Sequence, residues 1–357
     1  MYQYLCMNKK QNILIAGPIL PPAGGISIHI YRLEQLLKDE FDFTFIDESP
    51  SFKKNIFNIR SLNFIRYIKL VMASDLFFIH SGNKYFKKLH ILTGKLCRRK
   101  VIITLHGYGN ERAPLFRKID SFYFNLSDKI ILVNNQIASK LNLKPGKFEV
   151  KHAFLPPVMH KESPLPEFIT ANIKMAKKEN KTIICGNASR LKTFNNQDLY
   201  GLDMSIEMSK KLNENNQSHL FIYVVTSLDE GKDKYEAAEQ FIIENKMQDY
   251  FMLLNQEISF VNLIEASDIV LRPTNTDGDA LTIREGLFLG KTVIASDVVT
   301  RPEGTILFKT RDHHDLLEKL TSAIQDNIMN RKSQESNLLS EDKQYYSNLF
   351  NKVMNSN

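Results

Sequence analysis

Short apolar runs alternate with longer amphipathic stretches along the first half of the chain. The runs lack helical spacing, which is typical of strands that are buried on both faces. The stretches between them, such as residues 28–37 and 84–96, space their apolar positions as amphipathic helices do. The predicted strands of this half are residues 12–16, 42–46, 75–79, 101–105 and 129–133.

The second half repeats this alternation, so the whole chain predicts an α/β protein. Strand, helix and strand in succession indicate βαβ units, which form parallel sheets with helices on both faces. The chain has 357 residues, and a single hydrophobic core is usually too small for a chain of this length. We therefore expect two Rossmann-like doubly wound domains. The predicted strands of this half are residues 182–185, 220–225, 251–254, 269–271 and 292–295.

The boundary between the two domains is predicted in a stretch rich in proline and lysine. Prolines at positions 156, 157, 164 and 166 disfavour regular structure, and a lysine cluster follows them. We therefore expect an N-terminal domain over residues 1–156, a linker over 157–180 and a C-terminal domain over 181–340. Residues 341–357 predict a final amphipathic helix that packs back on the N-terminal domain.

Composition narrows the class of protein. Hydrophobic content of 43% and charged content of 24% are near the averages for globular proteins. The three cysteines are far apart in the sequence, so neither a disulfide framework nor a cysteine-based zinc site is expected. Neither a membrane-spanning run nor a signal-peptide pattern is evident, which favours a cytoplasmic location.

The turn after the first predicted strand is a candidate phosphate site. It spans residues 17–27, and the pair Gly24 and Gly25 stands just before a predicted helix that Ser27 could cap. Glycines allow close approach to the backbone, and helix N-termini favour anions. A glycine pair is also ordinary turn chemistry, so both interpretations stay open.

A second candidate site lies where the strand ending at Leu271 leads into a polar loop and a helix. If that helix begins near Ala280, the amides of residues 278–280 lie at its positive end and can bind a diphosphate. Asp277 then offers a carboxylate to sugar hydroxyls, and Glu285, eight positions later, offers another to ribose hydroxyls. An acidic loop before an ordinary amphipathic helix is the alternative.

Residues 271–297 resemble the signature of the family-four retaining glycosyltransferases, E-G-x-G-L-x-x-x-E-A-x-A-x-G-x-P-V-I-A. The register holds without a gap, and the matching residues are Asp277, Gly278, Leu281, Glu285, Gly290, Val293, Ile294 and Ala295. The departures are Asp277 for the first Glu, Ala280 for Gly, Gly286 for Ala and Thr292 for Pro. The carboxylate at position 277 is thus one methylene shorter than that of the pattern.

This resemblance implies a GT-B fold, in which two Rossmann-like domains face a central cleft, and transfer of a hexosyl group with retention of configuration. It assigns Glu285 to the ribose, Asp277 to the donor sugar, and the amides of Asp279, Ala280 and Leu281 to the diphosphate.

The family also carries a basic pair after the first strand of the second domain, where this chain has Arg190 and Lys192. A guanidinium and an ammonium there can stabilise the departing diphosphate, although solvated loop cations are the alternative.

Histidines end two neighbouring strands of the first half. His106 opens the sequence His-Gly-Tyr-Gly, and the family often places a His-Gly at the donor, so we expect His106 to act at the transferring centre. His80, at the end of the preceding strand, is a weaker candidate. Asp128 and Asp268 stand at strand starts, where we interpret them as structural.

No metal or other cofactor is expected beyond the nucleotide-sugar donor, a UDP- or GDP-sugar that serves as substrate. Asp277, Gly278 and Asp279 spell the D-x-D pattern that holds a divalent ion in another glycosyltransferase architecture. Two carboxylates with no third acid or histidine nearby in the sequence make a poor site for a hard cation. The prediction is therefore a metal-independent transferase.

The charge of the chain is divided unequally. Residues 1–156 carry 24 Lys and Arg against 11 Asp and Glu, whereas residues 157–357 carry 23 against 29. The excess cations are interleaved with aromatic and aliphatic residues over 52–69 and 84–100, which suits an anionic membrane surface. Ordinary core helices with solvated lysines are the alternative, and nucleic acid is not expected because no binding module accompanies the charge.

The predicted function is glycan transfer to a polyprenyl-diphosphate-linked acceptor in surface polysaccharide (capsule, O-antigen or exopolysaccharide) synthesis, by a peripheral enzyme on the inner face of the membrane. Two alternatives are a nucleotide-sugar epimerase of the same fold and a catalytically silent protein that binds nucleotide-sugars.

Overall fold

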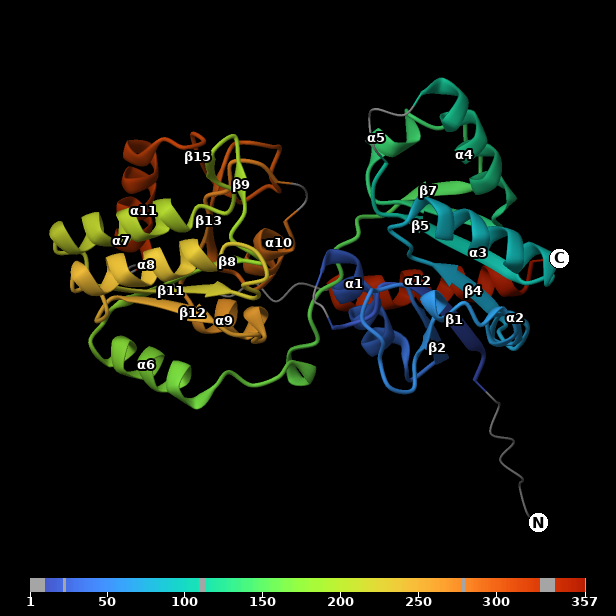
Figure 1. The fold of residues 1–357 in the computed structure, drawn as a ribbon, viewed down its shortest axis with the longest axis horizontal. Coiled ribbons are helices and arrows are strands. Elements are labelled where there is room, and N and C mark those ends of the chain that lie inside the picture. The colour runs from blue at the N-terminus through green and yellow to red at the C-terminus, as the bar shows by residue number, and fades with distance from the viewer. Residues whose placement is uncertain (1–9, 22–23, 109–112, 278–279, 328–337, 357) are drawn as a thin grey trace, which may run out of the picture. The chain divides into compact units, whose positions relative to one another are not determined.

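The computed structural model describes residues 10–21, 24–108, 113–277, 280–327 and 338–356. They form two compact units, which we call unit 1 and unit 2. Unit 1 comprises Met1–Val158 and Asn337–Asn357, and unit 2 comprises Met159–Ser336. Each unit has its own parallel sheet with helices on both of its faces (Figure 1).

Unit 1 is built on a seven-stranded sheet in the order β3-β2-β1-β4-β5-β6-β7, in which every pair is parallel. The order reverses beside β1, so the loops that follow β1 and β4 are where such sheets bind ligands. The strands are β1 (Asn12–Gly17), β2 (Asp42–Asp47), β3 (Phe57–Asn58), β4 (Leu76–Ile79), β5 (Lys100–Leu105), β6 (Lys129–Leu132) and β7 (Phe148–Val150).

Hydrophobic cores cover both faces of this sheet. Along β1, Leu14 and Ala16 enter one core with residues of α2, α3, α4 and α5, while Ile13 and Ile15 enter the other with residues of α1 and α12. Alternate side chains of a strand point to opposite faces, which is why a run without polar residues needs helices on both sides. The helices are α1 (Gly25–Leu37), α2 (Phe64–Met72), α3 (Lys84–Leu96), α4 (Pro114–Leu126), α5 (Asn135–Ala138) and α12 (Leu338–Met354).

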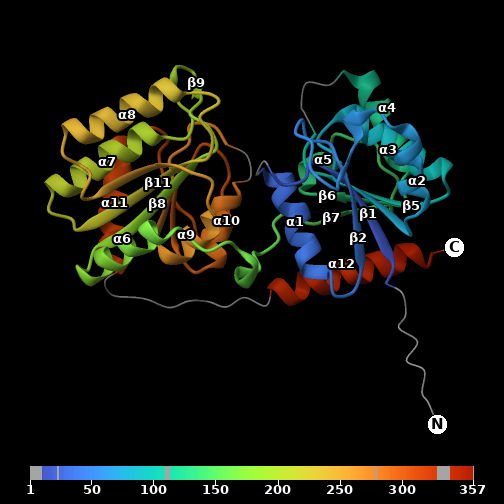
Figure 2. The same cartoon turned by 60° about the horizontal axis from the view of Figure 1, so that its bottom comes forward.

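The last helix, α12, packs on unit 1 although it follows unit 2 in the sequence. Figure 2 shows it crossing beneath the lower end of α1 and under the sheet, and the two helices are in contact. Phe350 is fully buried, and its ring meets those of Phe41 and Phe78 edge to face at 5.5 and 5.3 Å between centroids. An ion pair of 2.5 Å between Lys151 and Asp342 adds a polar link to this face.

Unit 2 is built on a six-stranded parallel sheet in the order β12-β11-β8-β13-β14-β15. One face packs against α7, α8 and α11 and the other against α6, α9 and α10. The strands are β8 (Thr182–Ala188), β11 (His219–Val225), β12 (Phe251–Asn255), β13 (Ile269–Arg272), β14 (Thr292–Ser296) and β15 (Ile306–Phe308), beside a hairpin of β9 (Thr193–Phe194) and β10 (Gln197–Asp198). The helices are α6 (Glu167–Lys178), α7 (Leu202–Glu214), α8 (Lys232–Glu244), α9 (Phe260–Ala266), α10 (Leu281–Phe288) and α11 (His313–Asn327).

The structure contains all ten predicted strands and the predicted α/β class. Their ends agree within one residue, except that β8 continues three residues further, to Ala188. The five strands that the pattern did not predict, β3, β7, β9, β10 and β15, are two or three residues long. Strands this short carry too few alternating positions to stand out in a sequence.

The linker predicted over residues 157–180 is wrong over residues 167–178, which are half of its length. Residues 167–178 form α6, a helix whose Ile169, Ile173 and Ala176 are buried in the core of unit 2. The prolines all precede this helix, and Pro166 is its N-cap, a position where a missing N–H costs nothing. The lysine cluster lies on the exposed side of α6, so it does not mark a break in the helix.

Candidate functional site

The carboxyl edge of the unit 2 sheet carries a network of buried polar side chains. Strands β8 and β13 are parallel neighbours, so Asn187 near the end of β8 and Arg272 at the end of β13 reach the same edge. Arg272 Nη1 donates to Asn187 Oδ1 at 3.3 Å, and its guanidinium lies 5.1 Å from the ring centroid of Tyr200. Thr282 on α10 donates to the same Asn187 oxygen at 3.3 Å.

Asp277 is held at this edge by two arginines. Arg272 donates from Nε to Oδ2 at 3.2 Å and from Nη2 to Oδ1 at 3.3 Å, which is the forked geometry that binds carboxylates most firmly. Arg301 Nη1 donates to Oδ2 at 2.9 Å, and Thr274 Oγ1 donates to the same oxygen at 3.2 Å. The Arg301 side chain is only 1% exposed, so Asp277 balances a charge that is buried.

These contacts fix the ionisation of Asp277. Burial by itself raises the pKa of this carboxyl, but the charges and hydrogen bonds of Arg272 and Arg301 outweigh burial and hold the pKa below its ordinary 3.8. Asp277 is therefore an anion at neutral pH. Its carboxylate accepts hydrogen bonds from Arg272, Arg301 and Thr274, so it organises two guanidinium groups at the predicted donor site.

Helix α10 begins at this edge, as the sequence predicted. Ala280 is its N-cap and Leu281 its first residue, and Ala280 has no side chain that could cap the helix. Gly278 and Asp279, the other predicted diphosphate ligands, lie outside the described residues. Glu285 lies one turn into α10 and is 5% exposed, so its carboxylate is largely buried beside this edge.

Gly286 brings α10 close to the sheet. A Cβ at this position would lie 2.7 Å from Cγ2 of Val293 on β14 and 3.1 Å from Cγ2 of Val270 on β13. Such distances exclude even an alanine unless the helix or the valine side chains shift. The glycine that replaces the alanine of the family signature thus sets the position of α10, and with it that of Glu285.

The predicted basic pair lies after β8, at the same end of the sheet. Arg190 Nη1 and Lys192 Nζ approach the two carboxylate oxygens of Glu230 at 3.5 and 3.1 Å. All three side chains are about half exposed, and exposed pairs of this kind contribute little to stability. The structure therefore brings the two cations together and leaves them accessible to an anion.

In unit 1 the predicted glycine pair lies at the start of α1. Gly24, not Ser27, is the N-cap, and Ser27 is the third helical residue, whose Oγ accepts from Gly24 N at 2.9 Å. Ser27 Oγ also donates to the carbonyl oxygen of Gly24 at 3.0 Å, so this side chain binds the N-cap residue from inside the helix. A Cβ on Gly25 would meet nothing within 4 Å, so the space above this turn is open.

His106 lies directly after β5 and next to two other histidines. His80, directly after the parallel neighbour β4, places Nδ1 at 3.0 Å from His106 Nε2. His29 of α1 has its ring centroid 5.0 Å from that of His80 and 5.2 Å from that of His106. Burial lowers the pKa of His29 to about 4 and lowers the pKa values of His80 and His106 well below 6.5. All three rings are neutral at pH 7.

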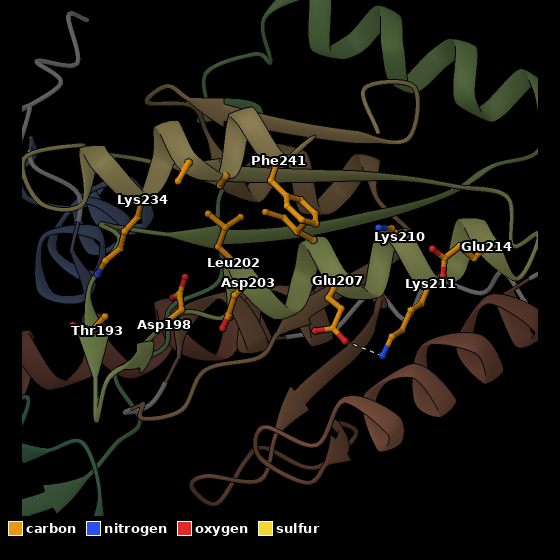
Figure 3. Close-up of a pocket in the computed structure, with 13 residues that line it drawn as sticks. Thr193, Asp198, Leu202, Asp203, Glu207, Lys210, Lys211, Glu214, Lys234 and Phe241 are labelled. Atoms are coloured by element: carbon orange, nitrogen blue, oxygen red, sulfur yellow. Dashed lines mark ion pairs between the residues drawn. The ribbon is translucent and has the colours of Figure 1, made fainter. Parts of the chain in front are cut away.

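The structure also has a cavity of about 720 Å³ on unit 2, which lies away from the predicted site residues. It is lined mainly by α7 and α8, and Figure 3 shows Phe241 and Leu202 at its apolar part and the ion pair of Glu207 with Lys211 at 2.8 Å. None of the predicted site residues lines it. Its acidic and basic side chains offset one another, so it offers no positive field for a diphosphate.

Arg272, Arg301 and Asn187 are among the polar residues of this edge that the sequence analysis missed. Arg272 ends an otherwise apolar strand, and a cation at that position is a usable signal. Arg301 gave no signal, because it stands 24 positions after Asp277 and reaches it only through the fold.

No protein-family model and no curated protein sequence matches this chain. Solved structures match almost its whole length. Anabaena Alr3699/HepE in complex with UDP and glucose is 14% identical, with a TM-score of 0.63 over 96% of this chain and 97% of that chain. A glycosyltransferase from Rickettsia africae ESF-5 is 18% identical, with a TM-score of 0.64 over 98% and 100%. Sucrose-phosphate synthase from Thermosynechococcus elongatus is 14% identical, with a TM-score of 0.56 over 97% and 96%.

These similarities, together with two parallel α/β units of seven and six strands, define the GT-B fold. At such identities the likeness concerns the fold. Among the described residues, no helix combines the length and the apolar character that crossing a bilayer requires.

Proposed function

We propose that this chain is a retaining glycosyltransferase that transfers a hexosyl group from a nucleotide-sugar to a lipid-linked glycan acceptor in surface polysaccharide synthesis. The observation that carries the proposal is the position of residues 271–297. The segment that resembles the family signature lies at the carboxyl edge of a parallel sheet, where it supplies a helix N-terminus and a cationic network. The solved Alr3699/HepE structure of the same fold holds UDP and glucose, which supports a nucleotide-sugar as donor.

The donor diphosphate would lie at the first turn of α10, and the accessible cations Arg190 and Lys192 would stabilise its negative charge as it departs. Asp277 keeps Arg272 and Arg301 in place at this edge of the sheet. Glu285 would accept hydrogen bonds from the ribose hydroxyls. The leaving group is thus stabilised by protein groups, and transfer should need no added Mg²⁺ or Mn²⁺.

The donor site is tested by the substitution Glu285→Gln, with the exposed Glu257→Gln as control. A hydrogen bond to a charged group contributes about 1.5–3 kcal/mol, so Glu285→Gln should weaken binding of the preferred nucleoside diphosphate by about 10- to 100-fold. The measurement is calorimetric titration of the full chain, after a thermal-shift screen with UDP, GDP, ADP and dTDP identifies the nucleotide. Equal affinities in the two variants would remove Glu285 from the donor site.

Turnover separates the proposal from its two alternatives. A transferase releases the nucleoside diphosphate only when an acceptor is present, and a retaining one leaves the anomeric configuration of the transferred sugar unchanged, as NMR of the product reports. An epimerase converts the free nucleotide-sugar without acceptor. A silent binding protein gives a thermal shift with the nucleotide and no release under either condition.

The acceptor side of the proposal rests on an exposed apolar face of unit 1. On α2, Ile65 is 72% exposed, and the exposed cations Arg66 and Lys69 stand beside it. On α3, Leu96 is 83% exposed. The other large apolar side chains exposed on α2, α3 and α4 are Phe64, Ile68, Met72, Tyr85, Leu92, Leu115, Phe116, Ile119 and Phe122. Apolar side chains flanked by cations suit the interface of an anionic bilayer.

A cavity of about 150 Å³ lies near this face, beside His106. Its lining includes Lys84, Lys87, Gly107 and Tyr108, at the N-terminal end of α3. Lys84, Lys87 and the N-terminus of α3 outweigh the Asp120 carboxylate, which also lines this cavity, and the remaining positive charge favours a phosphate group. This chemistry supports a phosphorylated lipid as acceptor, with its apolar chain left in the membrane.

Membrane binding is tested by co-sedimentation with vesicles of phosphatidylglycerol or of phosphatidylcholine. Ile65→Glu should abolish binding to the anionic vesicles, because it removes an apolar contact and adds a repelled charge. Ile243→Glu, on an exposed position of unit 2, should leave binding unchanged. Wild-type protein that stays in the supernatant with both vesicles at low salt would refute the membrane proposal.

A further inference from the structure

The three histidines at the carboxyl edge of the unit 1 sheet have the arrangement of metal ligands. One ligand nitrogen from each of His29, His80 and His106 lies within 4.8 Å of the other two. Three different elements supply them, since His29 is on α1 and the others directly follow β4 and β5. His29 and His80 are buried, at 3% and 0% exposure, and His106 is partly exposed.

The hydrogen bonds of His29 fix which of its nitrogens carries the proton. His29 Nδ1 lies 2.6 Å from the carbonyl oxygen of Ala153, which can only accept, so Nδ1 carries the hydrogen. His29 Nε2 is therefore a bare lone pair, and it is buried without a hydrogen-bond partner. A buried acceptor of this kind is unfavourable unless something binds to it.

We propose that His29, His80 and His106 bind a transition-metal ion of the zinc class. Neutral imidazole nitrogens are preferred ligands of Zn²⁺, and two such ligands at about 2.0–2.1 Å from a tetrahedral ion are about 3.3 Å apart. His80 Nδ1 and His106 Nε2 are 3.0 Å apart, so the ion would replace their shared proton with little movement of the rings. The Ala153 carbonyl orients His29 as outer-shell groups orient metal-bound histidines.

Among the described residues no fourth His, Cys, Asp or Glu joins this group. A three-histidine site with an open position is the arrangement that binds water or a ligand oxygen as the fourth partner. The inference does not rest on the proposed function, and it concerns a different unit from the one to which we assign the departing diphosphate. It also differs from a Mg²⁺ or Mn²⁺ requirement, because those ions prefer oxygen ligands.

The test is zinc and cobalt binding by the full chain after treatment with a chelator. Wild type should bind one equivalent of Zn²⁺ and give the visible absorption of tetrahedral Co²⁺. His29→Ala should bind Zn²⁺ about 100-fold more weakly, since losing an inner ligand costs at least as much as losing an outer-shell partner. The control is His152→Ala, an exposed histidine, which should keep wild-type affinity.

A second variant, His106→Asn, guards against misfolding of the buried His29→Ala, because His106 is partly exposed. Its circular dichroism should match wild type while its zinc affinity falls as that of His29→Ala does. Two results would overturn the proposal. One is a wild type that binds no Zn²⁺ at tens of micromolar. The other is equal zinc affinity in wild type, His106→Asn and the His152→Ala control.

Discussion

Asp277→Asn is the substitution whose effect the structure defines most fully. Asparagine keeps the shape of the side chain and removes its charge, so Arg272 and Arg301 lose their common partner. The carboxylate of Asp277 is 10% exposed, and the two arginine side chains are 10% and 1% exposed. Breaking a buried ion pair by removing one partner costs about 3–5 kcal/mol, because the remaining charge stays buried. We expect the free energy of unfolding of unit 2 to fall by that amount.

The matched control is Asp203→Asn in the same unit. Asp203 also pairs with an arginine, Arg311, at 2.5 Å, but its side chain is 44% exposed. An exposed pair contributes about 0–1 kcal/mol, so the same chemical change should cost little there. Urea denaturation of the full chain, followed by probes in each unit, measures both variants against wild type.

The pH dependence provides a second test of the same pair. The pKa of Asp277 is lowered in the folded protein, so its contribution to stability is complete above the ordinary value of 3.8. That contribution is lost as the pH falls through the lowered pKa, because protonation removes the same charge as the substitution does. The difference in the free energy of unfolding between wild type and Asp277→Asn should therefore shrink between pH 5 and the most acidic pH at which the protein stays folded. A difference below about 1 kcal/mol at pH 7, or one that grows on acidification, would refute the reasoning.

Three further substitutions test packing that the structure decides. Gly286→Ala should destabilise unit 2 by about 1–3 kcal/mol, because its Cβ would lie 2.7 Å from Val293 Cγ2. Gly201→Ala should cost at least as much, because Gly201 has φ +72° and a Cβ there would lie 2.4 Å from the Pro273 carbonyl oxygen. Phe350→Ala should cost unit 1 about 3–5 kcal/mol, because it leaves a cavity beneath α12. Thermal and urea unfolding of each variant provide the measurements.

For each of these substitutions, one result would contradict the prediction. Gly25→Ala is the control for the two glycine variants, since a Cβ there meets nothing within 4 Å, and it should leave stability unchanged. If Gly286→Ala or Gly201→Ala were as stable as Gly25→Ala, the neighbouring atoms would be able to move away from the added Cβ at no cost. Phe350→Ala should leave the transition of unit 2 in place, and a shift of that transition would contradict the assignment of α12 to unit 1.

The sequence predicted where α10 begins because the spacing of loop and helix residues is local. The start of α10, Ala280, Leu281 and Glu285 follow one another along a single loop and helix, so their spacing already implies their geometry. It could not locate the partners of Asp277. Arg272 is close to Asp277 in the sequence but ends strand β13, and Arg301 follows strand β14. Only the parallel pairing of β13 with β14 brings both arginines to one carboxylate.

The prediction of a linker over residues 157–180 failed for a related reason. Proline and lysine were interpreted by composition, whereas Ile169, Ile173 and Ala176 have the helical spacing that buries one face of α6. That face is stable only because unit 2 offers a core to receive it. Most helical stability in proteins comes from such packing, which composition alone does not reveal.

By itself, the sequence determined the order and type of the main elements, because strand and helix periodicities are properties of neighbouring residues. It also determined which turns follow which strands, and so where binding residues could gather. Only the tertiary structure decided which distant side chains meet. Parallel strands bring their carboxyl ends to one edge of each sheet. At this edge of the unit 1 sheet His29, His80 and His106 meet although they span 77 positions of the sequence, and at this edge of the unit 2 sheet Asp277 contacts two arginines. Contacts of this kind depend on strand order and register, which no local pattern encodes.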